Sequence, residues 1–330
     1  MTGDPTTATL LPVRSSPSDT LARIAAELAR DPRLKSPNTR RGYLADLVAF
    51  EAWRAGRPFT RLLVEAHAAE LQDLGRSPTT INRKLAAVRW WARRLADLAQ
   101  EDPVLSPDAR REIVEQSARI AAVGDVRGKR GQKGRHLSAG ELMALLSACA
   151  RDPKTAGVRD AALIALAWAT GARRAELAGL QLADYRAIGE DEGDLTIRGK
   201  GDKVRVAYVF DGAAAYLVDW LVVRGPAPGP LFEAINKGDR RLTGQGLSGA
   251  ALAEVLEKRR LEAGLQPLTW HDFRRTFAGN LLDNGSDLVT VQKLMGHSSP
   301  TTTAGYDRRG EEVKRRASRS LYVPYMGRRG

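Results

Sequence analysis

The sequence predicts a mainly α-helical protein with one small antiparallel β-sheet, arranged as two domains. Three observations predict this fold class. Apolar residues recur at helical spacing through most of the 330 residues, whereas the stretch Asp194–Val209 alternates between apolar and polar residues. A glycine-rich basic segment without an apolar stripe, Gly124–Arg135, separates the two helical regions. A chain of this length also favours about two domains.

The chain is predicted to divide into five consecutive segments. Its start is rich in Thr, Ser and Pro, which favours a flexible arm, and its end is basic. The predicted segments are an arm (1–17), a helical domain (18–123), a basic linker (124–136), a second domain (137–310) and a tail (311–330).

The first domain is predicted to consist of five helices. Leu21 begins the apolar pattern of the first, Asn38 is the expected N-cap of the second, and the third covers about residues 62–74. Ser77 is expected to cap a longer helix, and a last one covers about residues 107–122. Basic side chains gather opposite the apolar face of the long helix, with Trp90 on the same side: Arg83, Arg89, Arg93 and Arg94. Such a face is ordinarily solvated, and contact with phosphates is the alternative.

The second domain is predicted to begin with a capping box formed by Ser138 and Glu141. Its two strands are expected to be joined by the turn Gly199–Asp202. The expected helices cover about residues 139–151, 158–170, 173–179, 212–223, 246–263, 270–284 and 287–295.

The charge balance indicates a polyanionic partner. Lys and Arg number 52 and Asp and Glu 39, which gives a net charge of +13. Nucleic acid fits this charge, although membranes also attract basic proteins. The apolar run Ala161–Thr170 is shorter than the roughly 20 residues that a membrane span needs, so a buried helix is expected.

The cysteine and histidine content predicts neither a disulfide nor a metal site. Cys149 is the only cysteine and lies in an apolar pattern, so we expect a core position and a reducing compartment. The four histidines, His67, His136, His271 and His297, show no metal-ligand spacing.

Several polar residues have spacings that suggest a site. His271 and Arg274 share one helix face, and Arg173 stands at a helix start, where backbone N–H groups favour an anion. Lys200 lies at the hairpin tip, and Tyr306 follows His297 by nine residues. Each has an ordinary explanation: a surface ion pair, a pair between Arg173 and Glu176, a turn lysine, or a packed tyrosine.

Taken together, four motifs in this order resemble the tyrosine recombinases, the lambda-integrase family. They are TGARRAEL (170–177), GKGDKVR (199–205), HDFRRTFAGNLLDNG (271–285) and LMGHSSPTTTAGY (294–306). Residues 36–54 and 77–94 are similar to the core-binding domain of that family, and the resemblance covers roughly residues 18–320. It implies that residues 18–123 form a helical, SAM-like core-DNA-binding domain and residues 137–310 an α+β catalytic domain. The short N-terminal arm favours a compact integrase, a Xer-like resolvase, or an enzyme of a transposon or plasmid.

The resemblance also implies a role for each site residue. Tyr306 would be the nucleophile, Arg173 and Arg274 would bind the scissile phosphate, and His271 and His297 would assist proton transfer. Lys200 would be the general acid, with Lys203 as a possible substitute. Glu176 would hold the site residues in place without contacting the phosphate itself. Such a reaction stores the bond energy in a phosphotyrosine, so it needs neither ATP nor a metal or other cofactor.

As its partner the resemblance implies double-stranded DNA with specific sites, on which a homotetramer acts through a Holliday junction. It further implies exchange of the tail between protomers and a cytoplasmic, nucleoid-associated enzyme. Further DNA contacts are expected from the linker residues Lys129, Arg130, Lys133 and Arg135. Two alternatives stay open: a type IB topoisomerase or telomere resolvase with the same chemistry, and a DNA-binding regulator that has lost catalysis. An RNA-binding protein has no supporting motif.

Overall fold

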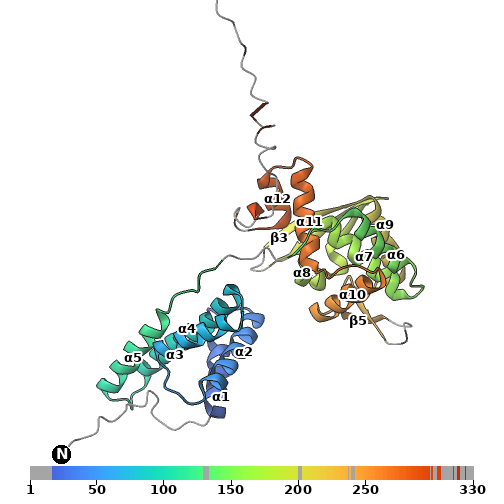
Figure 1. Ribbon diagram of the computed structural model, residues 1–330. Helices are drawn as coiled ribbons and strands as arrows, with labels where there is room; N and C mark the ends of the chain where they lie inside the picture. Colours follow the sequence, from blue (N-terminus) through green and yellow to red (C-terminus); the bar gives the residue numbers. More distant parts are fainter. Residues whose placement is uncertain are drawn as a thin grey trace, which may run out of the picture. The chain divides into compact units, whose positions relative to one another are not determined.

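The computed structural model describes residues 17–128, 134–199, 203–236, 242–297 and 303–305, with positions 238, 299, 315, 318, 319 and 324. The chain divides into two compact units between Lys133 and Gly134, each with its own hydrophobic core (Figure 1). Residues 1–16 of the N-terminal arm lie outside the described residues, as do residues 129–133 of the linker and most of the tail.

The first unit consists of helices, and α4 is at its centre. This helix packs against α2, α3 and α5, and α1 packs against α2. The helices are α1 (Pro17–Arg30), α2 (Pro37–Arg54), α3 (Arg61–Asp73), α4 (Pro78–Glu101) and α5 (Pro107–Ala121). Ser77 caps α4 as expected, because its hydroxyl accepts the backbone N–H of Thr80.

Two details of the first unit correct the sequence prediction. The N-cap of α2 is Ser36 and not Asn38, because Pro37 occupies the first helical position, where a missing N–H costs nothing. Trp90 does not lie on a basic surface: the residue is only 8% exposed. Its indole Nε1 donates to Asp31 at 2.7 Å, and a partner for the N–H is what lets the ring join the core.

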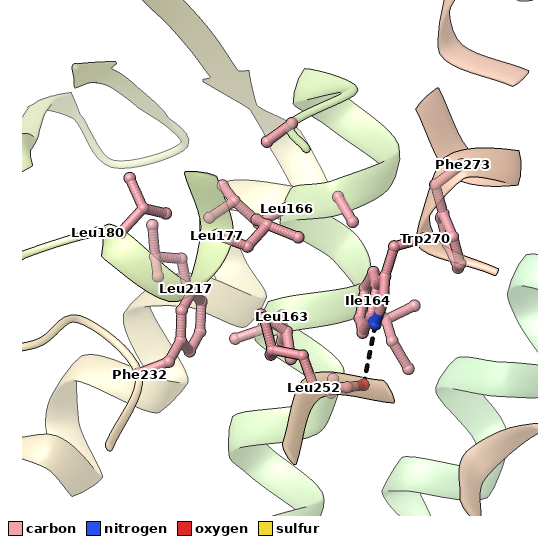
Figure 2. Packing of buried hydrophobic residues seen from close by; sticks show 14 of the residues in the cluster. Leu163, Ile164, Leu166, Leu177, Leu180, Leu217, Phe232, Leu252, Trp270 and Phe273 are labelled. Atoms are coloured by element: carbon pink, nitrogen blue, oxygen red, sulfur yellow. Dashed lines mark hydrogen bonds between the residues drawn. The ribbon is translucent and has the colours of Figure 1, made fainter. Parts of the chain in front are cut away.

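The second unit is built around α7, which is buried along most of its length. Figure 2 shows Leu163, Ile164 and Leu166 of this helix packed among side chains from its neighbours, including Trp270 of α11. The helices are α6 (Ala139–Ala150), α7 (Thr155–Thr170), α8 (Arg174–Gly179), α9 (Asp211–Arg224), α10 (Gly249–Glu262), α11 (Trp270–Asp283) and α12 (Leu288–Met295). The capping box of Ser138 and Glu141 is present at the start of α6.

A three-stranded antiparallel sheet packs one face on this core. Its strands, in the order β1-β2-β3, are β1 (Tyr185–Gly189), β2 (Glu192–Arg198) and β3 (Val204–Phe210). The predicted hairpin is β2 and β3, in which Leu195 pairs with Ala207 and Ile197 with Arg205. Three strands were not predicted, because their short sequences lack alternation: β1 and the separate pair β4 (Glu233–Ile235) and β5 (Leu242–Gly246).

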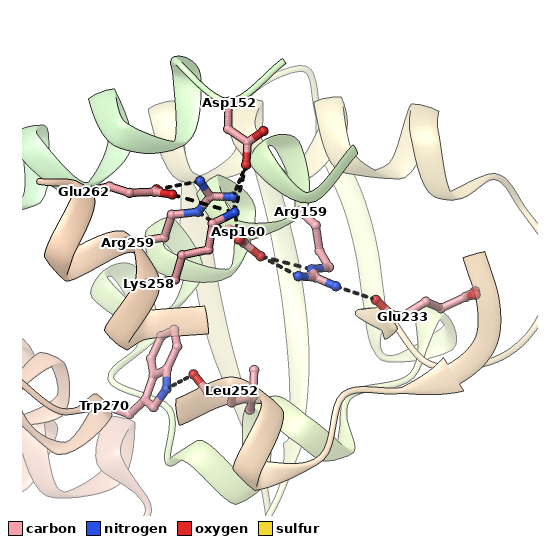
Figure 3. A network of polar contacts seen from close by, with 9 residues as sticks. All are labelled: Asp152, Arg159, Asp160, Glu233, Leu252, Lys258, Arg259, Glu262 and Trp270. Atoms are coloured by element: carbon pink, nitrogen blue, oxygen red, sulfur yellow. Dashed lines mark hydrogen bonds and ion pairs between the residues drawn. The ribbon is translucent and has the colours of Figure 1, made fainter. Parts of the chain in front are cut away.

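A buried network of charges ties α7 and α10 together (Figure 3). Arg259 is fully buried, and its guanidinium donates to Asp160 at 2.9 Å, to Asp152 at 2.7 Å and to Glu262 at 2.8 Å. Arg159 also donates to Asp160, at 2.8 Å. Because breaking a buried pair leaves an unpaired charge, removal of one partner from this network would destabilise the second unit.

The expected core positions of α7 and Cys149 are confirmed. Cys149 is buried, and burial raises the pKa of its thiol to about 12. None of the helices in the described part of the chain combines the length and apolar character that a membrane crossing needs.

Candidate active site

The first part of the site is the turn between α7 and α8. Gly171 ends α7 with φ of 57°, and a Cβ added there would lie 2.5 Å from Phe277 of α11. The turn therefore packs closely on α11 and needs glycine. Arg173 is the N-cap residue of α8, and its backbone N–H and its Nη1 both donate to Glu176, at 2.9 and 2.6 Å. The Arg173 side chain remains 43% exposed.

Arg274 joins this turn to the end of α12. The residue is 1% exposed on α11, and its Nη1 donates to the carbonyl of Gly171 at 2.7 Å. Its Nη2 donates to the carbonyl of Met295, the last residue of α12, at 2.5 Å. A guanidinium held by two backbone carbonyls has a fixed position, as recognition of a phosphate requires.

Glu176 lies behind Arg173 and binds a second arginine, Arg205 of β3. The Nη2 of Arg205 donates to Glu176 at 2.9 Å, and its Nε donates to the carbonyl of Leu294 at 2.9 Å. Burial alone would raise the pKa of Glu176, but hydrogen bonds from Arg205 and from the Arg173 backbone lower it. The carboxylate is therefore ionised and shared between two cations.

The base of the β2–β3 hairpin lies beside this carboxylate. The backbone N–H of Gly199 donates to the carbonyl of Lys203 at 2.7 Å, and a Cβ added to Gly199 would lie 3.5 Å from Glu176 Oε1. Lys203 is exposed, and Lys200 lies outside the described residues.

Two histidines belong to the same region. His271 is in the first turn of α11, where desolvation and the charges of Arg275 and Arg274 lower its pKa. His297 follows α12, and its Nδ1 lies 2.8 Å from the hydroxyl of Thr303. The pKa of His297 falls to about 4, because of burial and then the positive charges of Arg274, Arg173 and Arg205. His297 is therefore a neutral imidazole at physiological pH.

The structure thus brings together Arg173, Glu176, Arg274 and His297, with His271 beside Arg274. Tyr306 lies outside the described residues, three positions after the buried Thr303 that contacts His297. Sequence reasoning assigned no role to Arg205. A signal was present, because the alternation of β3 puts this arginine on the same face as the buried Ala207 and Val209.

The predicted DNA-contact residues have varied environments. Arg83 pairs with Asp46, Arg89 donates to Asp125 at 2.7 Å and Arg94 donates to Glu27 at 2.6 Å. Arg93 is exposed and has no ion pair within the described part of the chain.

The linker residue Arg135 pairs with Glu141 and donates to the carbonyls of Gln266 and Pro267, at 3.0 and 3.1 Å. Lys129, Arg130 and Lys133 lie outside the described residues. Three of the four helix arginines and Arg135 therefore have intramolecular partners, and Arg93 keeps its charge in solvent.

Comparison with known proteins identifies the family. The model of the phage integrase family matches residues 135–312. The tyrosine recombinase XerC of Alcanivorax borkumensis is 32% identical over 297 residues, which cover 87% of this chain and 88% of the relative. The tyrosine recombinase XerD of Oceanobacillus iheyensis is 30% identical over 268 residues, or 78% of this chain and 79% of the relative. The chain belongs to the phage integrase family of tyrosine recombinases.

Solved structures share the fold. XerH recombinase in a post-cleavage complex with a palindromic difH substrate matches with a TM-score of 0.65 and 19% identity, over 92% of this chain and 84% of that one. A lambda integrase tetramer bound to a Holliday junction matches with a TM-score of 0.60 and 20% identity, over 88% and 77%. The predicted fold class and the resemblance to site-specific recombinases are confirmed, and neither the topoisomerase nor the inactive regulator is favoured.

Proposed function

We propose that this recombinase cleaves and rejoins duplex DNA at specific sites, with Tyr306 as its nucleophile. The observation that carries the proposal is the fixed cluster of Arg173, Arg274 and His297, drawn from the α7–α8 turn, α11 and the end of α12. Two guanidiniums at one place suit the charge that gathers on the nonbridging oxygens of a phosphodiester in the transition state.

The reaction is a transfer of the phosphoryl group to tyrosine. The phenolic oxygen of Tyr306 attacks the scissile phosphorus, and the bond from phosphorus to the 5′ oxygen breaks. The phenol loses its proton as it attacks, and His271 and His297, whose lowered pKa values leave both imidazoles neutral and able to accept a hydrogen bond, assist this proton transfer. Lys200, or Lys203 in its place, gives a proton to the leaving 5′ oxygen. The 3′-phosphotyrosine keeps the bond energy, so the reverse attack by a 5′ hydroxyl rejoins DNA without ATP.

The two units would share the work of binding DNA. We propose that residues 18–123 are the core-DNA-binding domain and residues 137–310 the catalytic domain. The basic linker 124–136 would lie along the DNA, where each bound phosphate releases counterions. Four protomers would act on two sites through a Holliday junction, and the tail 311–330 would dock on a neighbouring protomer. An enzyme of this kind would work in the cytoplasm on the nucleoid.

Trapping of a covalent adduct tests the proposed nucleophile. The protein is incubated with fragmented DNA from the cells that encode it, and DNA that stays on denatured protein is recovered and sequenced. We expect adducts at a recurring sequence for the wild type and none for Tyr306→Phe, whose DNA affinity stays within about threefold.

The matched control is Tyr208→Phe, because Tyr208 is exposed on β3. This variant should form adducts like the wild type. Adducts on Tyr306→Phe would refute the nucleophile, and a wild type without any adduct would refute the proposed function.

A further inference from the structure

The charge of Arg205 is buried between three parts of the site. Its side chain is 9% exposed and leaves β3 on the core-facing side of the sheet. One nitrogen binds Glu176, which follows the α7–α8 turn, and another binds the carbonyl of Leu294 near the end of α12. A Cβ added to Gly296 would lie 3.1 Å from Arg205 Cδ, so the aliphatic part of the side chain packs on the residue before His297.

These contacts join the elements that carry the proposed catalytic groups. β3 is the second strand of a hairpin, Lys200 falls in sequence between its two strands, and the base of this hairpin lies beside Glu176. Glu176 binds Arg173, and Leu294 is three residues from His297. The hairpin, Arg173 and His297 are therefore connected through one side chain.

The charges explain why this side chain is an arginine. Glu176 is buried, and it accepts from Arg173 Nη1 on one oxygen and from Arg205 Nη2 on the other. Without Arg205, nothing in the described part of the chain would balance this carboxylate except Arg173. The guanidinium of Arg173 would then be drawn toward the second oxygen as well, which already accepts the Arg173 backbone N–H, and fewer of its side-chain N–H groups would be left for a phosphate.

We propose that Arg205 is a positioning residue for strand cleavage. Its guanidinium binds one oxygen of the Glu176 carboxylate and holds the end of α12, so that the distance between Arg173 and His297 is maintained. The proposal rests on the proposed function, because the measured quantity is DNA cleavage. A lysine cannot replace Arg205, since one ammonium does not reach the carboxylate and the carbonyl in the geometry of the fork.

The test separates binding from chemistry. Nicked duplexes of the sequence recovered from wild-type adducts are used to measure both the dissociation constant and the first-order rate of cleavage in the bound complex. We expect Arg205→Met to bind within about threefold of wild type and to cleave at least about 30-fold more slowly. Arg205→Lys should cleave at least about tenfold more slowly than the wild type. If the methionine variant does not fold, the lysine variant is the one that tests the proposal.

The control is Arg186→Met on β1, whose side chain is 75% exposed and pairs only with Asp194 within the described residues. It should cleave at the wild-type rate.

A double variant tests whether Arg205 acts through Glu176. In the double variant Glu176→Gln and Arg205→Met no unbalanced carboxylate remains, so its loss of rate should be smaller than the product of the two single losses. Losses that multiply, or an Arg205→Met or Arg205→Lys variant that cleaves within about threefold of wild type, would overturn the proposal. Failure of the proposed function looks different, because the wild type itself would then form no adduct.

Discussion

At the scale of single residues, the pKa of His297 makes a prediction about pH. The folded pKa of about 4 lies below the unfolded value of about 6.5. Between these values the unfolded chain binds a proton that the folded chain does not, so stability rises with pH there. The contribution of His297 is therefore present above about pH 6.5 and is lost as the pH falls to about 4. We expect the free energy of unfolding to fall over this window.

NMR titration and unfolding at several pH values check this prediction. The imidazole of His297 should stay neutral down to a pH well below 6, and His297→Gln should weaken the pH dependence of stability. The pH dependence of stability in His271→Gln is measured for comparison, because the pKa of His271 is lowered as well. An imidazole of His297 that titrates near the ordinary histidine value would contradict the burial and the cationic surroundings described for it.

At the scale of elements, the turn after α7 makes a prediction about glycine. In Gly171→Ala the alanine would have to adopt a left-handed backbone conformation. Its Cβ would also lie 2.5 Å from the ring of Phe277. Left-handed backbone costs roughly 1–2 kcal/mol, and overpacking adds roughly 1–3 kcal/mol. Cleavage should slow too, because the carbonyl of Gly171 accepts from Arg274.

The matched control is Gly264→Ala, in the same unit. Gly264 has φ of 68°, close to that of Gly171, but a Cβ there meets nothing within 4 Å. Its free energy of unfolding should fall only by the cost of the left-handed backbone conformation, and it should cleave DNA at the wild-type rate. Urea unfolding measures both variants, and equal losses of stability would show that Phe277 does not restrict the turn.

The elements also show how far sequence patterns reach. Caps and helical periodicity predicted the helices, since these depend on neighbours within one or two turns. The strand β1 was missed, because a short exposed strand is stabilised by its pairing with β2 and has little pattern of its own. The burial of Trp90 was missed for a related reason: its partner Asp31 is 59 residues away in sequence.

At the scale of the whole molecule, the net charge of +13 predicts DNA binding that depends strongly on salt. Each phosphate contact contributes about −0.9 to the slope of log affinity against log salt. We expect Arg93→Ala to weaken binding and to reduce this slope by about one, because this arginine is exposed on α4.

Arg94→Ala is the control from the same helix. Its guanidinium binds Glu27, so the variant should lose stability of the first unit and leave the slope unchanged. Fluorescence anisotropy with a labelled duplex measures both variants over a range of salt. A slope that Arg93→Ala leaves unchanged would exclude this part of α4 from the DNA interface.

The sequence by itself determined the family, the order of its motifs and the identity of the proposed catalytic residues. Local spacing carries that information: Arg173 after a glycine turn, and His271 three residues before Arg274. Only the tertiary structure decided which arginines bind acidic partners and that Arg205 joins Glu176 to the end of α12. Those contacts connect residues 29 and 89 positions apart, and packing of whole elements sets such distances, which no local pattern encodes.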